Sequence, residues 1–299
     1  MYDDLECGVM LSQSLEERGN SKPRGPDFLV IGAQRSGTAW LYFVLKRHPN
    51  LWLPPIKEIH YFDNLNEGPA DDPKRWLRVA TSRWRVLNSW MFSYLLGKRD
   101  DDWYAKLFHK AQLKGRLAGE ITPAYATLDE QMFQRIRHIN RDIKLIFIMR
   151  DPVDRLWSAI TNHAFKFKND PLRCPPTLEE ALAKARTAKF KARSAYTDTI
   201  AQLEAIFPSS QLHLCFFDDL RERPETLVGQ ILSFLGVNPG EAKNILLSSK
   251  INSSAGAIPM PVGFQREMAE AYLPMVRVLS QRFNGPPKIW LARYERLIG

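Results

Sequence analysis

The residues with the clearest chemical potential lie in the segment Gly32-Ala-Gln-Arg-Ser-Gly-Thr38. Its glycines let the backbone turn sharply and aim successive N–H groups at an anion. A helix predicted to run from Thr38 to Arg47 would add the partial positive charge of its N-terminus. Arg35 can reach phosphate or sulfate oxygens, and the Ser36 and Thr38 hydroxyls are further donors. The segment predicts an anion-binding loop, although a plain glycine-rich turn would carry the same glycines.

This loop differs from the phosphate loop of nucleoside-triphosphate hydrolases. Gly32 and Gly37 match the spacing of G-x-x-x-x-G-K-[ST], but Thr38 stands at the lysine position. Without that lysine the β- and γ-phosphates lose their main counter-charge, and no clear magnesium-binding acid ends another predicted strand. A nucleotide kinase is therefore the alternative function.

A second segment with anion-binding residues follows the apolar run Lys144–Met149. Arg150 comes directly after this predicted strand, and Ser158 is eight residues further on. If Asp151 caps a helix that starts at Pro152, the strand end and the second helical turn can both face the ligand of the first loop. A capped helix start without any ligand would explain the same residues.

Together and in this order, the two segments resemble the nucleotide signatures of sulfotransferases that use 3′-phosphoadenosine 5′-phosphosulfate (PAPS). In that family the first loop, usually Gly-x-x-Lys-x-Gly-Thr, holds the 5′-phosphosulfate, and the arginine and serine of the second bind the 3′-phosphate. Arg35 replaces the family's lysine, which stabilises the bridging oxygen as the sulfuryl group leaves. Arginine also donates and keeps its charge, but it is a broader, planar fork.

The resemblance implies PAPS as donor, adenosine 3′,5′-bisphosphate (PAP) as product, and no metal. It also implies a P-loop-NTPase-like sulfotransferase fold. The nucleotide contacts that it implies are Gln34, Arg35, Ser36, Gly37, Thr38, Ala39, Arg150, Ser158, Arg193, Tyr196, Asn252 and Ser253.

The segment Lys57-Glu-Ile-His-Tyr-Phe-Asp63 resembles a segment of the heparan-sulfate-type branch, in which the glutamate is the usual candidate general base. An acceptor hydroxyl must lose its proton as the new S–O bond forms, and a carboxylate or imidazole can take it. An extended backbone would place Glu58 and His60 on the same side. We predict Glu58 as the base, with His60 as its orienting partner or substitute, and Lys57 and Asp63 beside the acceptor. A solvated glutamate and a core histidine are the structural alternative.

A third segment, Glu120-Ile-Thr-Pro-Ala-Tyr125, resembles the family's lining of the acceptor cleft. It implies that Thr122 and Tyr125 contact sulfate or acceptor. A turn fixed by Pro123, with a packed tyrosine, explains the pattern equally well.

The elements that must position these residues alternate between strand and helix. Apolar runs at 28–31, 144–149 and 211–217 predict strands, and helices are expected at 129–139, after Thr177 and from Pro224 to Gly236. The alternation predicts an α/β fold with a central parallel β-sheet flanked by helices. We expect a poorly ordered lead-in over 1–25 and a single domain over 26–299, with a helical, Trp-rich insertion around 73–109.

Composition limits the remaining choices. The chain has 44% hydrophobic and 25% charged residues and no apolar stretch of membrane-spanning length. The acidic N-terminal residues do not resemble a signal peptide, and three scattered cysteines suit a reducing compartment, so we expect a cytoplasmic protein without a membrane partner. No nucleic-acid motif accompanies the net charge of +9. We expect a carbohydrate or small-molecule acceptor with a hydroxyl or amino group, and a non-catalytic polyanion-binding module is a further alternative; the sequence does not indicate an oligomeric state.

Overall fold

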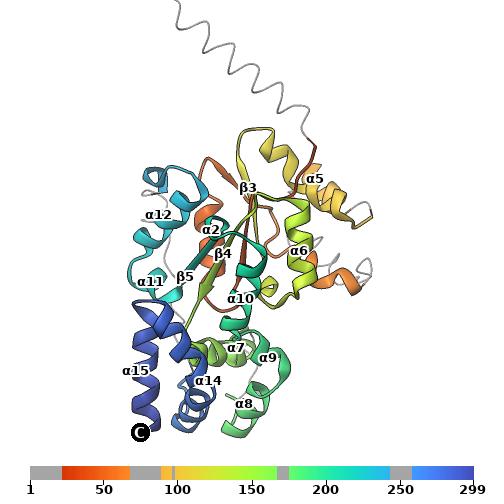
Figure 1. Cartoon of the computed structure of the whole chain (residues 1–299). Coiled ribbons are helices and arrows are strands. Elements are labelled where there is room, and N and C mark those ends of the chain that lie inside the picture. The colour runs from red at the N-terminus through yellow and green to blue at the C-terminus, as the bar shows by residue number, and fades with distance from the viewer. Residues whose placement is uncertain (1–21, 68–88, 96–97, 167–174, 243–257) are drawn as a thin grey trace, which may run out of the picture.

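The computed structural model describes residues 22–67, 89–95, 98–166, 175–242 and 258–299. Its centre is a five-stranded sheet in the order β2-β3-β1-β4-β5, and every strand pair in it is parallel (Figure 1). The strands are β1 (Phe28–Gly32), β2 (Leu51–Trp52), β3 (Leu117–Ile121), β4 (Lys144–Met149) and β5 (Leu212–Phe216). The predicted parallel sheet with flanking helices is confirmed. β2 and β3 were not predicted.

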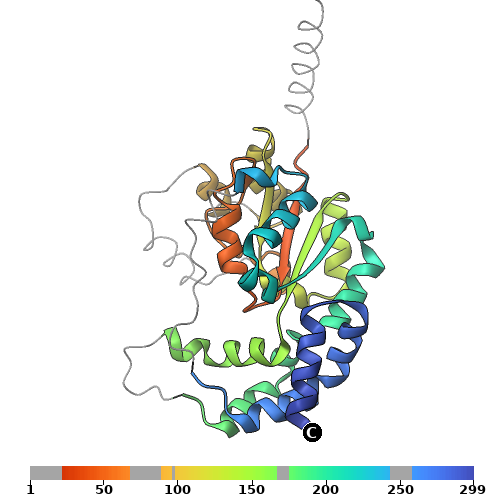
Figure 2. The same cartoon turned by 90° about the vertical axis from the view of Figure 1, so that its left-hand side faces the viewer.

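Alternate residues of the central strands face opposite sides of the sheet. Val30 and Ile148 pack with helices α2 (Thr38–Leu45) and α12 (Pro224–Leu235). Leu29 and Phe147 belong to a larger cluster with α5 (Asp101–Gln112), α6 (Glu130–Ile139) and α10 (Tyr196–Ile206). Figure 2 shows these two helical layers on either side of the sheet. Burial on both faces explains why the strands read as continuous apolar runs.

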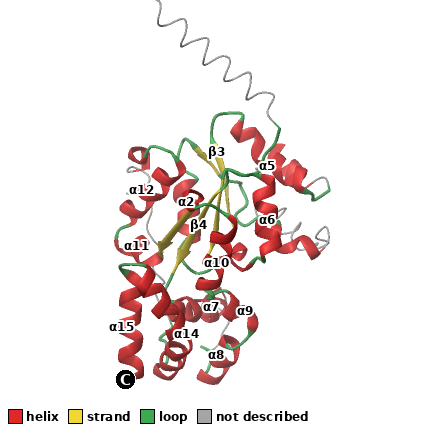
Figure 3. Ribbon diagram, in the orientation of Figure 1, coloured by secondary structure: helices red, strands yellow, loops and turns green. Residues whose placement is uncertain are grey.

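The remaining helices lie beyond the sheet and beside it (Figure 3). They are α4 (Ser89–Leu95), α7 (Pro152–Lys166), α8 (Leu178–Ala185), α9 (Ala188–Ala192), α11 (Phe217–Glu222), α14 (Val262–Arg282) and α15 (Pro286–Ile298). Short 3₁₀ turns include η1 (Phe62–Glu67) and η2 (Pro123–Thr127). None of the helices within the described ranges is both long and apolar enough to cross a membrane.

Local capping signals read from the sequence are confirmed. Asp129 caps α6 by accepting from the Met132 N–H, and Thr177 forms a capping box with Glu180 at the start of α8. Gly236 ends α12 in the left-handed region, with φ at 82°. These helix ends depend on neighbouring residues alone, which is why the sequence locates them well.

The described part of the Trp-rich insertion consists mainly of α4 and the first part of α5; residues 73–88 and 96–97 lie outside the described residues. Several of its aromatic side chains pack inward: the Tyr104 ring stacks on Tyr61 at 4.5 Å, and Trp103 is 7% exposed, whereas Phe92 is exposed. The predicted lead-in also falls largely outside the described residues, over 1–21. The single domain over 26–299 stays a prediction.

Because the strands are parallel, their carboxyl ends meet at one edge of the sheet. The Gly32 loop, Thr122, Arg150 and Phe217 directly follow or end β1, β3, β4 and β5 at that edge. Open α/β sheets bind ligands outside the carboxyl ends of their strands. The sheet therefore brings together segments that are far apart in the sequence.

Substitution of Gly37, which precedes α2, tests how tightly the carboxyl edge of the sheet is packed. Its φ is 80°, and an added Cβ would lie 3.1 Å from the Phe217 ring and 3.2 Å from Leu220. Gly236 has nearly the same φ, but an added Cβ there meets nothing within 4 Å. We expect Gly236→Ala to lower the free energy of unfolding by about 1 kcal/mol through backbone strain, and Gly37→Ala by roughly 1–3 kcal/mol more through overpacking. Denaturant titration measures both, and equal losses would contradict the packing constraint.

Candidate active site

The Gly32–Thr38 loop connects β1 to α2. Arg35 takes a left-handed conformation, with φ at 71°. Ser36 is fully buried, and its Oγ has no hydrogen-bond partner. A buried hydroxyl without a partner is costly unless a ligand or water satisfies it. The loop therefore has an unused donor directly before the start of a helix.

The second signature meets this loop through Arg150. The Arg150 Nη1 donates to the Arg35 carbonyl oxygen at 2.9 Å, and the Arg35 Nε donates to Ser158 Oγ at 3.0 Å. The Arg150 guanidinium also lies over the Phe217 ring, 4.7 Å from its centre. The two signatures, separated by more than a hundred residues, thus form one cluster of donors. Phe217 was not predicted as a site residue, although its place at the end of a strand was a usable signal.

The charges in this cluster favour an anion. Burial, and then the nearby charge of Arg150, lower the pKa of Arg35. Burial likewise lowers the pKa of Arg150, against the charge of Asp154 and other neighbours. Anionic groups bound at the two guanidinium groups would relieve this repulsion and give each a charged hydrogen-bond partner.

Tyr196, the first residue of α10, contacts the cluster; Arg193 lies near Tyr196 in the sequence, and Arg155 lies in α7. Tyr196 is buried, and its hydroxyl donates to the Arg150 carbonyl oxygen at 2.9 Å. Arg193 is half-buried, and burial followed by the charge of Arg155 lowers its pKa. Arg155, which was not predicted, is fully buried and donates to Ser194 Oγ at 2.8 Å. Asn252 and Ser253 lie outside the described residues.

The start of α7 is held by the C-terminal helix. Asp151 caps α7, as predicted, by accepting from the N–H of Val153 at 2.9 Å. The Tyr294 hydroxyl donates to the same carboxylate at 2.9 Å, and Arg293 donates to Asp154 at 2.9 Å. Because Arg150 directly precedes this cap, α15 fixes the backbone that carries it.

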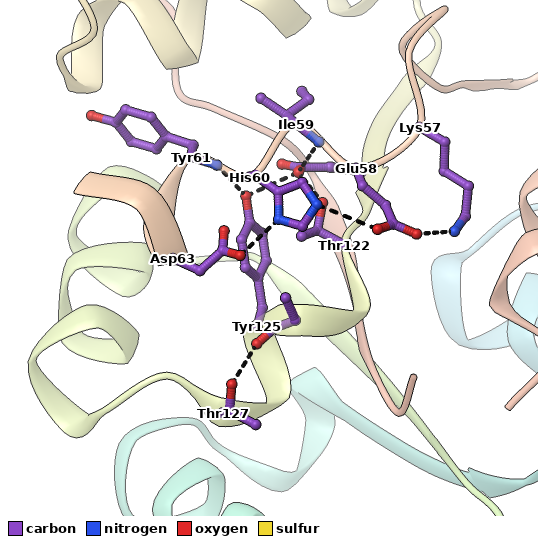
Figure 4. Close-up of polar contacts among 11 residues, drawn as sticks. Lys57, Glu58, Ile59, His60, Tyr61, Asp63, Thr122, Tyr125 and Thr127 are labelled. Carbon is purple, nitrogen blue, oxygen red and sulfur yellow. Dashed lines mark hydrogen bonds and ion pairs between the residues drawn. The ribbon is translucent and has the colours of Figure 1, made fainter. Parts of the chain in front are cut away.

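The segment Lys57–Asp63 forms a second polar cluster (Figure 4). His60 Nδ1 lies 2.7 Å from Asp63 Oδ2, and His60 Nε2 lies 3.3 Å from Glu58 Oε2. Lys57 Nζ contacts the other oxygen of Glu58. Glu58 and His60 therefore meet, but not through the extended backbone that would place them on the same side: φ is 64° at Glu58 and 56° at His60.

Backbone strain coincides with the predicted chemistry. Within the described ranges, the non-glycine residues with positive φ are Arg35, Glu58 and His60. Such conformations cost free energy and persist where the surrounding structure enforces them, most often at functional sites. The three predicted catalytic residues are thus the strained ones.

The cluster fixes the charges of Glu58 and His60. Burial alone would raise the pKa of Glu58, but the hydrogen bond from His60 and the charge of Lys57 lower it to about 2. Hydrogen bonds to Asp63 and then to Glu58 raise the pKa of His60 to about 9, against the effect of burial. At neutral pH Glu58 is therefore ionised and His60 is positively charged, so of these two residues Glu58 is the one that can accept a proton.

Thr122 and Tyr125 lie inside the protein. Both side chains are fully buried, and both hydroxyl groups donate to Glu120, with the Tyr125 bond at 2.9 Å. The contact with sulfate or acceptor predicted for them finds no support in this arrangement. Glu120 was not predicted as a site residue. The sequence signal that could have indicated it is its position two residues before Thr122, in the same segment. The same η2 turn packs against the phosphate loop, where an added Cβ on Gly32 would lie 2.7 Å from Ala126.

This geometry agrees with comparisons to known proteins. The chain matches the model of the sulfotransferase family over residues 26–240. The chain belongs to this family. Heparan sulfate glucosamine 3-O-sulfotransferase 5 of Homo sapiens is 26% identical over 223 residues, which are 72% of this chain and 54% of that protein. The membrane-associated sulfotransferase kil1 of Dictyostelium discoideum is 30% identical over 132 residues, 44% of this chain and 21% of that protein. The chain thus spans about half, or less, of the length of these curated relatives.

Solved structures show the same fold. The sulfotransferase from Alicyclobacillus acidocaldarius superposes with a TM-score of 0.61 at 23% identity, covering 89% of this chain and 98% of that one. The sulfotransferase domain from the Synechococcus PCC 7002 olefin synthase gives 0.52 at 19% identity, with 81% and 91% covered. Both the family and the fold expected from the two signatures are therefore confirmed.

The His60 cluster predicts a pH dependence of stability. Because the folded pKa of His60 is raised from 6.5 to about 9, its protonation stabilises the fold fully below pH 6.5, and this contribution is lost as the pH rises through 9. The melting temperature of wild type should exceed that of His60→Gln at pH 6, and the gap should close above pH 9. The same change at the exposed His138 serves as control. A gap that does not vary with pH would contradict the ion pairs.

Proposed function

We propose that this sulfotransferase moves the sulfuryl group of PAPS to a hydroxyl or amino group of a carbohydrate or small molecule. The observation that carries this proposal is the junction of Arg150, Arg35 and Ser158, which makes one site from two anion-binding signatures. A nucleotide with phosphates at both its 5′ and 3′ positions needs such a paired site. A cytoplasmic location, and an acceptor other than nucleic acid, remain predictions.

The residues present fit this donor. The buried Ser36 hydroxyl, unpartnered in the structure, and the amides at the start of α2 suit the 5′-phosphosulfate, with Gln34, Gly37, Thr38 and Ala39 around it. Arg150 and Ser158 suit the 3′-phosphate, since the Ser158 hydroxyl accepts from Arg35 and keeps its own proton to donate. Arg193 and Tyr196 are proposed to support the 3′-phosphate side. Asn252 and Ser253, which are also predicted to contact the nucleotide, lie outside the described residues.

The donor supplies a sulfuryl group that passes to the acceptor oxygen by in-line displacement. As the new S–O bond forms, Glu58 takes the acceptor proton, and the old S–O bond breaks to release PAP. His60 and Asp63 keep Glu58 in place. A carboxylate with a pKa of about 2 is a weak base. If the Lys57 side chain turns from Glu58 to the sulfuryl oxygens, Glu58 loses that positive neighbour and the pKa of Glu58 rises. Arg35 stabilises charge on the leaving oxygen.

Replacing Glu58 by glutamine tests the base. The amide cannot take a proton, so kcat should fall by about 10²–10⁴-fold, whereas PAP should bind as in wild type because Glu58 lies outside the phosphate loop. Steady-state kinetics and calorimetry measure the two effects, and Glu130→Gln on the exposed face of α6 is the control. An active Glu58→Gln enzyme would remove Glu58 from the mechanism.

Replacing Arg150 by alanine tests the 3′-phosphate site. Loss of a charged hydrogen bond should weaken PAP by about 10–100-fold, and adenosine 5′-phosphosulfate, which lacks the 3′-phosphate, much less. Arg223→Ala removes an exposed arginine of a surface ion pair and should change neither affinity. Equal losses for the two nucleotides would count against the assignment.

Transfer itself is tested by incubating the protein with PAPS and a panel of hydroxyl and amine acceptors. Mass spectrometry should detect one added sulfuryl group on at least one acceptor, together with formation of PAP. A full panel without transfer, and without PAP release, would contradict the proposal.

A further inference from the structure

The strained segment that carries Glu58 and His60 is held from below by two hydrogen bonds. The Ile59 N–H donates to Glu120 Oε1 at 3.2 Å, and the Tyr61 N–H donates to the Tyr125 hydroxyl at 2.9 Å. Ile59 and Tyr61 are buried, whereas the residues that alternate with them are partly exposed. Figure 4 shows the Tyr61 amide bonded to the hydroxyl of Tyr125, which belongs to the η2 turn. The Ile59 amide is bonded to Glu120, which lies in β3 just before that turn. The anchored amides thus flank His60, and the first lies directly after Glu58.

Glu120 is the centre of this support. It is 1% exposed, and its carboxylate accepts from Ile59, from the hydroxyls of Thr122 and Tyr125, and, at 2.5 Å, from the hydroxyl of Tyr104. A buried carboxylate is costly to desolvate unless such donors satisfy it. Because four donors satisfy it, the Glu120 carboxylate is held rigidly, and its hydrogen bonds connect β3, α5 and the Lys57–Asp63 segment.

We propose that Glu120 and Tyr125 are positioning residues that hold Glu58 and His60 in their strained, facing arrangement. The inference rests on the proposed role of Glu58 as base. Positive φ at Glu58 and His60 is disfavoured for side chains of this size, so the segment keeps it only while its amides are held. Once released, the backbone would relax toward ordinary φ, and Glu58, His60 and Asp63 would separate.

Two tyrosines offer a matched comparison. Tyr125 and Tyr104 are both fully buried, and both donate to Glu120. Only the Tyr125 hydroxyl also accepts from the backbone of the segment. Tyr125→Phe therefore frees the Tyr61 amide, whereas Tyr104→Phe removes a bond to the same carboxylate and leaves the segment tied.

The experiment titrates His60 by NMR in wild type and in both variants, and measures kcat with PAPS and affinity for PAP. In Tyr125→Phe the His60 pKa should fall from about 9 toward 6.5, kcat should fall about tenfold, and affinity for PAP should stay within about twofold, because the phosphate loop keeps its contacts. In Tyr104→Phe the His60 titration should match wild type.

The outcomes separate this proposal from the proposed function. If His60 titrates in Tyr125→Phe as in wild type, or if the two variants shift it equally, the positioning role is wrong. If His60 shifts in Tyr125→Phe alone but kcat is unchanged, positioning of the base is likewise overturned. If wild type transfers to no acceptor, the proposed function fails, while the His60 titrations still decide whether Tyr125 holds the segment. Glu120→Gln keeps an oxygen that can accept from the Ile59 amide, so the His60 pKa should stay raised in this variant. A His60 pKa that falls in Glu120→Gln would contradict the role of the bond between Ile59 and residue 120.

Discussion

Two guanidinium groups at the carboxyl edge of the sheet are held close together, and the rest of the donor side is arranged around them. Arg150 is bonded to the backbone of Arg35, the Arg35 side chain is bonded to Ser158, and Tyr196 and Phe217 fix Arg150 from behind. Like charges repel more strongly when partly removed from water. Keeping them adjacent costs free energy that binding of an anion would offset, so the contacts between β1, β4 and α7 would preorganise the proposed phosphate site.

The acceptor side follows a different principle. Glu58 and His60 owe their arrangement to a buried, satisfied carboxylate beneath them rather than to a ligand charge. The η2 turn packs on Gly32 on one side and bonds to Tyr61 on the other, and so lies between the phosphate loop and the proposed base. Buried polar networks rigidify a structure when every member is satisfied. The turn after β3 therefore aligns the two halves.

The sequence predicts what depends on neighbouring residues. The loop from Gly32 to Thr38 and the Asp151 cap were recognisable because a strand, a turn and a helix start have local signals. β3 is as long as β1, but it was missed because Gly119 and Glu120 interrupt its apolar run. The positive φ values of Glu58 and His60 could not be predicted, because the groups that anchor this backbone, Glu120 and Tyr125, lie about sixty residues away. Burial of Thr122 likewise depends on tertiary packing that no local pattern encodes.

In the proposed function, one site binds a nucleotide through phosphates at both its 5′ and 3′ positions. Calorimetric titration of the wild-type chain with PAP, and separately with ATP and magnesium, tests it most directly. The junction of Arg35, Arg150 and Ser158 predicts that PAP binds at least about tenfold more tightly, since ATP offers nothing to the 3′-phosphate donors. Tighter binding of ATP with magnesium would contradict the account and favour a kinase.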